Sequence, residues 1–344
     1  MKQAKKCGSN LFEEVKLDCE NLIYVAGRPG MGTTSLALHM VLEYVRENIK
    51  SVCNSRNTEF EIYLTQSVGD AETFIKNTCR KYENSDVTCR FYACGGDGTI
   101  NECVNGIVGF DHAELAAIPI GTGNDFVRNF GSAESYFDLE SLMASHAISC
   151  DLIKYNDRYS LNMINIGYDC AVVGRTARIK KNPLIPGKLA YVLGLVAELV
   201  KKTGVSFHLT ADGQDRGDHR LLLSLFANGG FCGGGFYSNP DASLFDRSID
   251  CIAIKNIGRI RFLSLVGVYK KGLHLVEKYN NIIEHFKCNE AHIHMDEETP
   301  VSVDGEILML KDAVLSVEHE ALSVWLPCGV EPLVASEQKE EAIV

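Results

Sequence analysis

The chain has 344 residues, 46% of them hydrophobic and 23% charged, and a formal net charge of −11. This length suits two domains that each bury a core, and the composition is that of a soluble globular protein. The acidic balance argues against a nucleic-acid-binding protein. No apolar run approaches the roughly 18 residues that span a bilayer, and the basic N-terminus lacks the apolar core of a signal peptide.

The thirteen cysteines are odd in number and include no C-x-x-C pair. Several lie inside apolar runs, where cysteine behaves as a small hydrophobic residue. This pattern indicates reduced thiols and a cytoplasmic location, and it favours neither a disulfide framework nor a zinc site.

After a polar leader at residues 1–20, the pattern predicts an α/β domain over residues 21–140. Strands are expected at residues 21–26, 61–65, 91–94 and 115–120, and helices at about 36–45, 71–82 and 100–107. This alternation predicts a parallel sheet with crossover helices.

The loop after the first strand, G-R-P-G-M-G at residues 27–32, is similar to a P-loop. Gly27 and Gly32 have the right separation, and Thr34 supplies the hydroxyl. Thr33, however, stands where a P-loop has the lysine that contacts the β- and γ-phosphates. The sequence therefore argues against an ordinary P-loop ATPase, although the N–H groups of this loop remain able to contact phosphate.

The stretch F-Y-A-C-G-G-D-G-T-I-N-E at residues 91–102 reads as a strand, a glycine turn and a helix. Such turns expose backbone N–H groups to phosphate at the carboxyl end of a parallel strand. Asp97 has the same sign of charge as phosphate, so its expected role is to handle a cation or a proton beside it. The alternative is a tight turn in which Asp97 only caps the helix.

A second glycine turn, at residues 121–125, follows the next strand. Ligands bind at these strand ends in open α/β sheets, so both turns are candidate parts of one site. Asp125 is a candidate helper of Asp97, but Asn124 and Asp125 are also expected to cap the helix that follows. Arg128 reads equally well as a phosphate contact or as a solvated helix residue.

A β-rich domain is expected over residues 145–330. Val205, Phe207, Leu209 and Ala211 share one face of a strand, with turns at 212–213 and 217–218 and a tight hairpin at 304–305. One long helix is expected at about residues 189–202, and residues 331–344 form a frayed tail. His292 and His294 are expected to be a surface pair, and Trp325 a core residue.

Four motifs in order resemble the diacylglycerol kinase catalytic family, and more narrowly its soluble bacterial lipid kinases related to diacylglycerol and sphingosine kinases. They are C-G-G-D-G-T-I-N-E at 94–102, P-I-G-T-G-N-D-F-V-R at 119–128, F-A-N-G-G-F-C-G-G-G with N-P-D-A-S-L-F-D-R-S-I-D across 226–250, and V-D-G-E at 303–306. The resemblance covers about residues 22–328. It implies an N-terminal α/β nucleotide domain similar to phosphofructokinase and NAD kinase, and a C-terminal β-sandwich.

The implied reaction is ATP-dependent phosphorylation of a lipid hydroxyl, with Mg²⁺, most simply of diacylglycerol to phosphatidic acid. The resemblance assigns ATP contacts to the first loop, the end of the second strand and the two glycine turns: Gly30, Gly32, Thr65, Gly95, Gly96, Asp97, Gly98, Thr99, Asn101, Glu102 and Thr122. The resemblance also maps a structural metal onto Ser243, Asp246 and Ser248, with a carboxylate from Asp246 and backbone carbonyls from the two serines, and Mg²⁺ prefers such oxygen ligands.

Asp304 and Glu306 correspond to the catalytic acids of the family, and Asp97 is assigned to the Mg²⁺ that accompanies ATP. Either Asp304 or Glu306 is the base, with Glu306 ranked slightly higher, and Asp304-Gly305 alone reads as a type I′ turn. Two departures stand out: Ala26–Gly30 replaces the N-P-x-S-G of the family, and Arg247 follows Asp246 where the family has glycine. If that position needs a positive φ, arginine strains the loop.

Two other functions compete: an NAD kinase, which shares the G-G-D-G turn, and a degenerate protein that binds nucleotide or lipid without turnover. The expected partner is a lipid at the inner face of the membrane, reached by peripheral contact. Residues 175–188 carry five bases and no acid around an apolar Leu-Ile pair, which indicates either a docking edge or a solvated loop. The oligomeric state is left open, with a homodimer as one option.

Overall fold

The computed structural model describes residues 21–26, 46–56, 59–167, 170 and 204–333. The chain divides into two compact units. The first contains the chain up to Cys150 together with Glu320–Leu333, and the second contains Asp151–His319. Each unit is described by itself.

The first unit is built on a parallel sheet in the order β2-β1-β3-β4, with the end of β15 added beside β4. The strands are β1 (Asn21–Ala26), β2 (Glu59–Leu64), β3 (Cys89–Gly95), β4 (Ala113–Pro119) and the last residues of β15 (Glu306–Trp325). Every residue of β3 is buried, as expected of a central strand covered on both faces. The predicted parallel sheet is confirmed.

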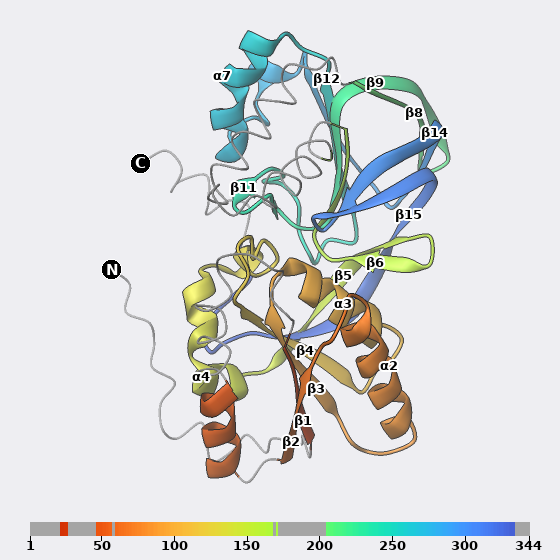
Figure 1. Cartoon of the computed structure of the whole chain (residues 1–344). Coiled ribbons are helices and arrows are strands. Elements are labelled where there is room, and N and C mark those ends of the chain that lie inside the picture. Colours follow the sequence, from red (N-terminus) through yellow and green to blue (C-terminus); the bar gives the residue numbers. More distant parts are fainter. Residues whose placement is uncertain (1–20, 27–45, 57–58, 168–169, 171–203, 334–344) are drawn as a thin grey trace. The chain divides into compact units, whose positions relative to one another are not determined.

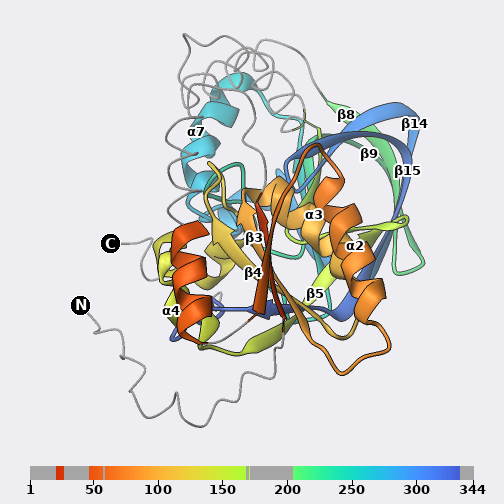
Figure 2. The same ribbon diagram turned by 60° about the horizontal axis from the view of Figure 1, so that its bottom comes forward.

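Helices cover both faces of this sheet (Figures 1 and 2). On one face lie α2 (Asp70–Tyr82) and α3 (Asp97–Ile107), and on the other lie a helix at residues 46–55 and α4 (Leu139–Met143). Ile49 and Cys53 of the helix at 46–55 pack with Leu142 of α4 against Tyr92 and Cys94 of β3. Two 3₁₀ helices precede α4, η1 (Val127–Phe130) and η2 (Ala133–Phe137).

The second unit is built on antiparallel pairs in the order β13-β12-β9-β7-β14-β15. Its strands are β5 (Ala147–Tyr155), β6 (Arg158–Ser160), β7 (Met163–Gly167), β8 (Val205–Ala211), β9 (Gln214–Ala227), β12 (Ile249–Lys255), β13 (Ile283–Cys288), β14 (Glu290–Val303) and most of β15; β10 (Phe231–Cys232) and β11 (Phe236–Tyr237) form a separate hairpin. The described part of this unit also contains the helix α7 (Arg259–Lys270) and the 3₁₀ helix η3 (Glu277–Tyr279).

The central strands of the second unit bury both faces. Cys251 and Ala253 of β12 enter one hydrophobic core, with strands β7, β8, β14 and β15. Ile252 and Ile254 enter another, beside Leu265 of α7. Successive residues of a strand point to opposite faces, so near-continuous apolar runs such as 249–254 fit a strand between two cores. The predicted β-sandwich is confirmed.

Several predicted elements differ from the structure. Gly217-Asp218 is no turn but part of β9, where the pairing register shifts so that Leu209 faces Gly217 and Thr210 faces Asp215. The extra residue makes a bulge, and Gly217 adopts the positive φ (79°) that the bulge requires. The helix α7 was not predicted. Residues 320–333 return to the first unit, because Val324 and Trp325 pair with β4.

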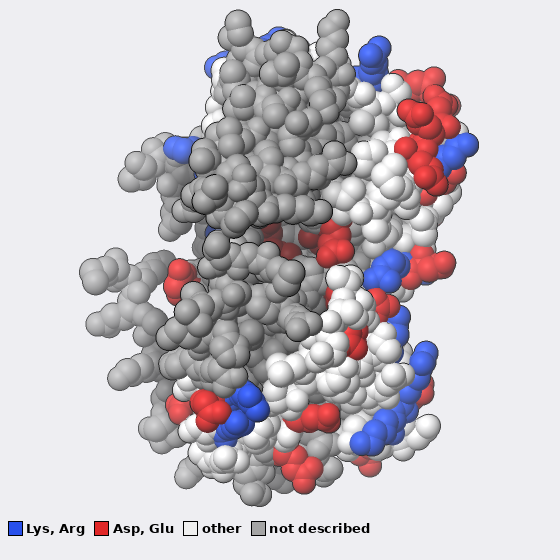
Figure 3. All heavy atoms as spheres, viewed as in Figure 1, with Lys and Arg blue, Asp and Glu red and all other residues white. Residues whose placement is uncertain are grey.

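Some predictions fall on parts of the chain outside the described residues: the loop at 27–32, the helix at 36–45, the long helix at 189–202 and the basic segment at 175–188. Within the described residues, no helix is both long and apolar enough to cross a membrane. Eleven cysteines in the described part of the chain are free thiols, as predicted. Acidic side chains gather at one end of the second unit, over β8, β9 and β14 (Figure 3).

Candidate active site

The two glycine turns of the first unit lie directly against each other. They follow β3 and β4, which pair in parallel so that Gly95 is level with Pro119. A Cβ added to Gly121 would lie 2.4 Å from the Cα of Gly96, a backbone atom that cannot move aside cheaply. Glycine is therefore required for contact between the turns, and not only for the approach of a phosphate.

Asp97 joins the first turn to the second. It is the first residue of α3, and its Oδ1 accepts a hydrogen bond from the backbone N–H of Phe126 at 3.2 Å. No side chain caps α3, whose N-cap residue is Gly96. The N-terminal N–H groups of a helix lack intrahelical acceptors and carry a partial positive charge, so this end of α3 suits an anion.

The second turn is held by side chains that fold back on it. Asn124 has a positive φ (53°) and donates to the carbonyls of Pro119 and Gly121 at 3.0 and 3.1 Å. The prediction that Asn124 and Asp125 cap the next helix is wrong: η1 begins after Phe126 and has no side-chain cap. Arg128 donates to the Gly123 carbonyl at 3.2 Å and lies 3.8 Å from the Asp125 carboxylate.

The other predicted nucleotide contacts of the first unit are distributed around these turns. Thr99 is half-buried in the first turn of α3, and Thr122 is exposed in the second glycine turn. Asn101 and Thr65 are buried, and Asn101 accepts from the amide of Asn105 at 3.2 Å. The remaining assignments are the half-buried Gly98 and Glu102, and Gly30 and Gly32, which lie outside the described residues.

The V-D-G-E motif of the second unit is the hairpin between β14 and β15. Asp304 and Gly305 both have positive φ (47° and 89°), as a two-residue type I′ turn requires. The Asp304 carboxylate accepts four hydrogen bonds at 2.8–3.1 Å, from the Ser160 hydroxyl and from the backbone N–H groups of Leu161, Asn162 and Met163. Burial raises the pKa of this carboxyl, and the four donors oppose the shift.

The segment at residues 160–163 also binds the F-A-N-G-G motif. The Asn162 carbonyl accepts from the N–H groups of Asn228 and Gly229, and the Asn162 amide donates to the Phe231 carbonyl at 2.6 Å. Asn228 is 1% exposed and donates to the carbonyls of Asp151 and Leu161. The V-D-G-E and F-A-N-G-G motifs, about 75 residues apart in the chain, are therefore joined through residues 160–163, which belong to none of the four motifs.

Glu306 follows the turn as the first residue of β15 and is exposed. Alternation places it on the same strand face as Leu308 and Leu310, which pack on the core. Tyr155 lies nearby: burial raises the pKa of its hydroxyl, Arg158 lowers it, and the charges of Asp304 and Glu306 raise it. The structure thus separates the two acids, one enclosed by donors and one open to solvent.

The predicted metal residues share one loop between Asp241 and Asp250. Asp246 Oδ1 accepts from the Ser248 hydroxyl at 2.8 Å, and Asp246 Oδ2 forms an ion pair with the Lys287 ammonium at 2.5 Å. Ser243 uses its hydroxyl to accept from the Phe245 N–H. The Asp246 carboxylate, which was expected to bind a cation, is therefore engaged by this chain's own groups.

Arg247 has a positive φ (60°), the conformation that the comparison with D-G predicted to be strained. Its N–H donates to Asp151 Oδ2 at 2.8 Å, and its guanidinium contacts His319. His319 in turn pairs with Asp151 Oδ1 at 2.7 Å, and Asp151 is 1% exposed. These contacts hold a backbone conformation that costs about 1–2 kcal/mol for a residue other than glycine.

The structure also describes the predicted surface histidines and the predicted core tryptophan. His292 and His294 lie on the exposed face of β14 and pair with Glu290 and Asp312 at 2.8 and 2.6 Å, as expected of a surface pair. Trp325 is buried and donates to Glu114 at 2.6 Å. No cluster of three or more His, Cys, Asp or Glu side chains in the described ranges is arranged to hold a metal ion.

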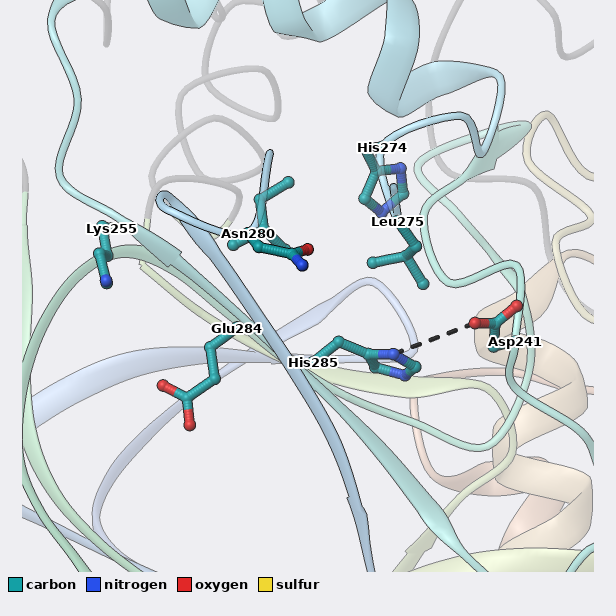
Figure 4. Close-up of a pocket in the computed structure, with 8 residues that line it drawn as sticks. Asp241, Lys255, His274, Leu275, Asn280, Glu284 and His285 are labelled. Atoms are coloured by element: carbon teal, nitrogen blue, oxygen red, sulfur yellow. Dashed lines mark ion pairs between the residues drawn. The ribbon is translucent and has the colours of Figure 1, made fainter. Parts of the chain in front are cut away.

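A pocket of about 500 Å³ lies beside the loop between Asp241 and Asp250, and Asp241 is part of its lining. Figure 4 shows the His285 ring directed toward the Asp241 carboxylate, with His274 and Leu275 at the same end. Asp241 Oδ2 lies 4.0 Å from His285 Nδ1. His274 is 1% exposed, and burial lowers the pKa of its imidazole to about 4.

This pKa predicts an acid-sensitive fold. Between pH 7 and pH 5 an unfolded histidine of ordinary pKa takes up a proton, whereas folded His274 stays neutral until about pH 4. The unfolded state is therefore favoured as pH falls, and the contribution of His274 to the unfolding free energy should drop by about 2 kcal/mol over this range. Urea unfolding of wild type and His274→Gln at both pH values measures this. The variant should lose about that much pH dependence, and equal dependence in both proteins would contradict the assignment.

Local sequence pattern does not indicate that Lys287, Asp250 and His285 lie together. His285 and Lys287 are two residues apart, which places them on one face of β13, but only the pairing of β13 with β12 brings Asp250 opposite Lys287. The partners of Asp304 were missed for the same reason, since they lie more than 140 residues away in the chain.

Two family models match this chain. A family model described as "Diacylglycerol kinase catalytic domain" matches residues 39–155, and one described as "YegS C-terminal NAD kinase beta sandwich-like domain" matches residues 162–326. The chain belongs to the diacylglycerol kinase catalytic family. Membership of this kinase family confirms the resemblance seen in the four motifs, and the two descriptions confirm the predicted pair of domain folds.

Relatives of this diacylglycerol kinase family member carry matching names. A Staphylococcus epidermidis protein named "Putative lipid kinase" is 28% identical over 309 residues, covering 88% of this chain and 93% of that protein. A similarly named Staphylococcus aureus protein is 27% identical, covering 78% and 88%. The crystal structure of "a putative diacylglycerol kinase from Bacillus anthracis str. Sterne" superposes with a TM-score of 0.71 at 23% identity, covering 92% of this chain and all of that one, which shows a shared fold.

Proposed function

We propose that this protein is an ATP-dependent lipid kinase that transfers the γ-phosphoryl group to a lipid hydroxyl, with diacylglycerol as the first substrate to test. One observation carries the proposal: two glycine turns pack together at adjacent strand ends and are joined by Asp97 at the uncapped N-terminus of α3. Family membership and the names of the relatives support the same reaction class.

In this reaction the lipid hydroxyl oxygen bonds to the γ-phosphorus while the bond from that phosphorus to the β,γ-bridging oxygen breaks, and ADP leaves. Catalysis then depends on positioning the phosphates and neutralising their charge. We assign phosphate binding to the backbone N–H groups of the turn at 95–99. Asp97 is assigned to the Mg²⁺ that accompanies ATP as part of the substrate.

The hydroxyl proton needs an acceptor, and we assign that role to Glu306. Its carboxylate is exposed on a rigid hairpin, whereas the Asp304 carboxylate already accepts four hydrogen bonds. A base must reach the proton that it removes, and an enclosed, satisfied carboxylate is poorly placed to do so. Asp304 instead fixes the turn from which Glu306 projects.

The reaction is tested by ATP consumption and phosphate incorporation in mixed micelles. The acceptors are diacylglycerol, monoacylglycerol, phosphatidylglycerol and a sphingoid base, with NAD assayed separately. We expect phosphorylation of at least one lipid and no turnover of NAD above background. Phosphorylation of NAD would replace the proposal with an NAD kinase. Nucleotide binding without turnover of any lipid would replace it with a degenerate binding protein.

A lipid substrate implies contact with a membrane surface, which we propose is peripheral and at the inner face. The supporting feature is the basic segment at residues 175–188, which lies outside the described residues. Each basic residue near an anionic surface contributes about 1 kcal/mol to binding. Anionic lipid in the micelles should therefore raise activity relative to neutral micelles.

A further inference from the structure

The loop at residues 241–250, for which the motif resemblance implies a metal, contacts a lysine side chain. The Lys287 ammonium has oxygens from three residues around it: Asp246 Oδ2 at 2.5 Å, Asp250 Oδ2 at 3.0 Å and the backbone carbonyl of Asp241 at 3.2 Å. The Asp246 carboxylate and the Asp241 carbonyl accept hydrogen bonds from this ammonium, and Asp250 Oδ2 adds an ion pair.

The position of this lysine is set by the pairing of strand β13 with β12. Lys287 lies in β13 directly opposite Asp250 of β12, in a continuous antiparallel register from Ile249 to Ile254. Asp250 is 0% exposed, and its other oxygen is held by His285 at 2.9 Å. A buried carboxylate requires a charge partner, and the register supplies one without any ligand.

The loop itself is fixed around this ammonium. Asp246 Oδ1 is bound by the hydroxyl and the N–H of Ser248, which leaves Oδ2 directed to Lys287. On either side of Asp246 in the sequence, the loop is bound to Asp151. The Leu244 carbonyl accepts from the Asp151 N–H at 2.8 Å, and the Arg247 N–H donates to the Asp151 carboxylate. The two sides of the loop are thus tied to the sheet through this chain's own groups.

We propose that the Lys287 ammonium is the built-in cation of this loop and replaces a divalent metal, so that the loop folds without one. A divalent ion bound through Asp246 would lie within a few ångströms of the ammonium, and like charges at that distance repel strongly. Mg²⁺ also demands about six oxygens in octahedral geometry, whereas the three oxygens gathered here already surround the Lys287 ammonium. This inference does not depend on the proposed kinase reaction.

Removing the ammonium should convert the loop into one that needs a metal. In Lys287→Ala, Asp246 and Asp250 face each other without a cation, and the loop should open. Hydrogen exchange of peptides covering residues 241–250, followed by mass spectrometry, measures this in the full-length protein. With EDTA present, we expect exchange in Lys287→Ala on the order of tenfold faster than in wild type, as for the loss of a charged hydrogen-bond partner. Excess Mg²⁺ or Ca²⁺ should restore slow exchange in the variant.

Four comparisons make the test specific. Wild-type exchange in this loop should be the same with EDTA and with Mg²⁺. Lys311→Ala, which removes an exposed lysine from β15, should behave as wild type. The double variant Lys287→Ala, Asp246→Asn should show fast exchange that Mg²⁺ does not slow, because the metal ligand is gone. Lys287→Met, which keeps the aliphatic stem, should match Lys287→Ala if charge and not packing is decisive.

Two results would overturn the proposal. One is faster exchange of the wild-type loop on chelation, with calorimetry showing one divalent ion that Asp246→Asn removes, since the loop would then hold a metal beside the lysine. The other is an exchange rate in Lys287→Ala equal to wild type with EDTA, since the loop would then need no cation at all.

Discussion

Asp97→Asn is expected to lower kcat by on the order of 10²–10³-fold, the size seen when one charge-stabilising group is removed from a polar active site. Asparagine has nearly the same shape and keeps an oxygen to accept from the Phe126 N–H, which the native carboxylate binds at 3.2 Å. The contact between the two glycine turns should therefore survive, and thermal unfolding should stay close to wild type. The variant keeps the acceptor for Phe126 and removes the negative charge, so it tests the proposed role of that charge in holding Mg²⁺.

Two further variants define this result. Asp111→Asn makes the same charge change at an exposed position between α3 and β4 and should keep wild-type kcat. Asp97→Ala removes the oxygen as well, so it should lower both kcat and Tm, because the Phe126 N–H loses its acceptor. Steady-state assays on the lipid identified in the micelle panel supply kcat for all three. An Asp97→Asn enzyme with near-normal kcat would show that the residue only joins the turns.

Local pattern predicted most of the fold. Alternating apolar residues predicted β8, and the strand-turn-helix pattern of residues 91–107 predicted β3 and α3. Both patterns are local, since each depends only on residues close together in the sequence. The bulge at Gly217 was mistaken for a turn because glycine with a positive φ serves either structure. The prediction places residues 320–330 in the β-rich half, whereas Glu320–Leu333 groups with the first unit, since nothing in a strand's sequence tells which sheet its end will join.

Candidate site residues could be located by motif, but their partners could not. The sequence places Asp304 and Glu306 in one tight turn and leaves their roles open. Their difference arises from residues 160–163, whose three N–H groups and one hydroxyl surround Asp304 only after β7 pairs with β14. The same holds for Asp246, whose partner Lys287 arrives through the pairing of β12 with β13. Such contacts depend on long-range register, which no local pattern contains.

Substitutions of the two acids should therefore affect different properties: the change at Glu306 should lower activity, and the change at Asp304 should lower stability. Glu306→Gln should lower kcat by on the order of 10²-fold or more, because the amide cannot accept the hydroxyl proton. The side chain is exposed, so Tm should stay near wild type. Asp304→Asn should cost about 3 kcal/mol of unfolding free energy, and roughly 10 °C in Tm, because its NH₂ group would face the Leu161 N–H that now donates to Oδ2.

The two measurements are made on the same preparations: kcat on the identified lipid at a temperature well below both unfolding transitions, and Tm by calorimetry. Glu290→Gln, an exposed glutamate that begins β14 and pairs with His292, is the matched control for Glu306→Gln and should change neither quantity. Nucleotide affinity should persist in Glu306→Gln, because the phosphates are assigned to the turn at 95–99. If Glu306→Gln keeps the wild-type kcat and a folded Asp304→Asn enzyme loses most of its kcat, Asp304 and not Glu306 is the base that accepts the hydroxyl proton. In that case the four donors around Asp304 would serve to tune a base and not to anchor a turn.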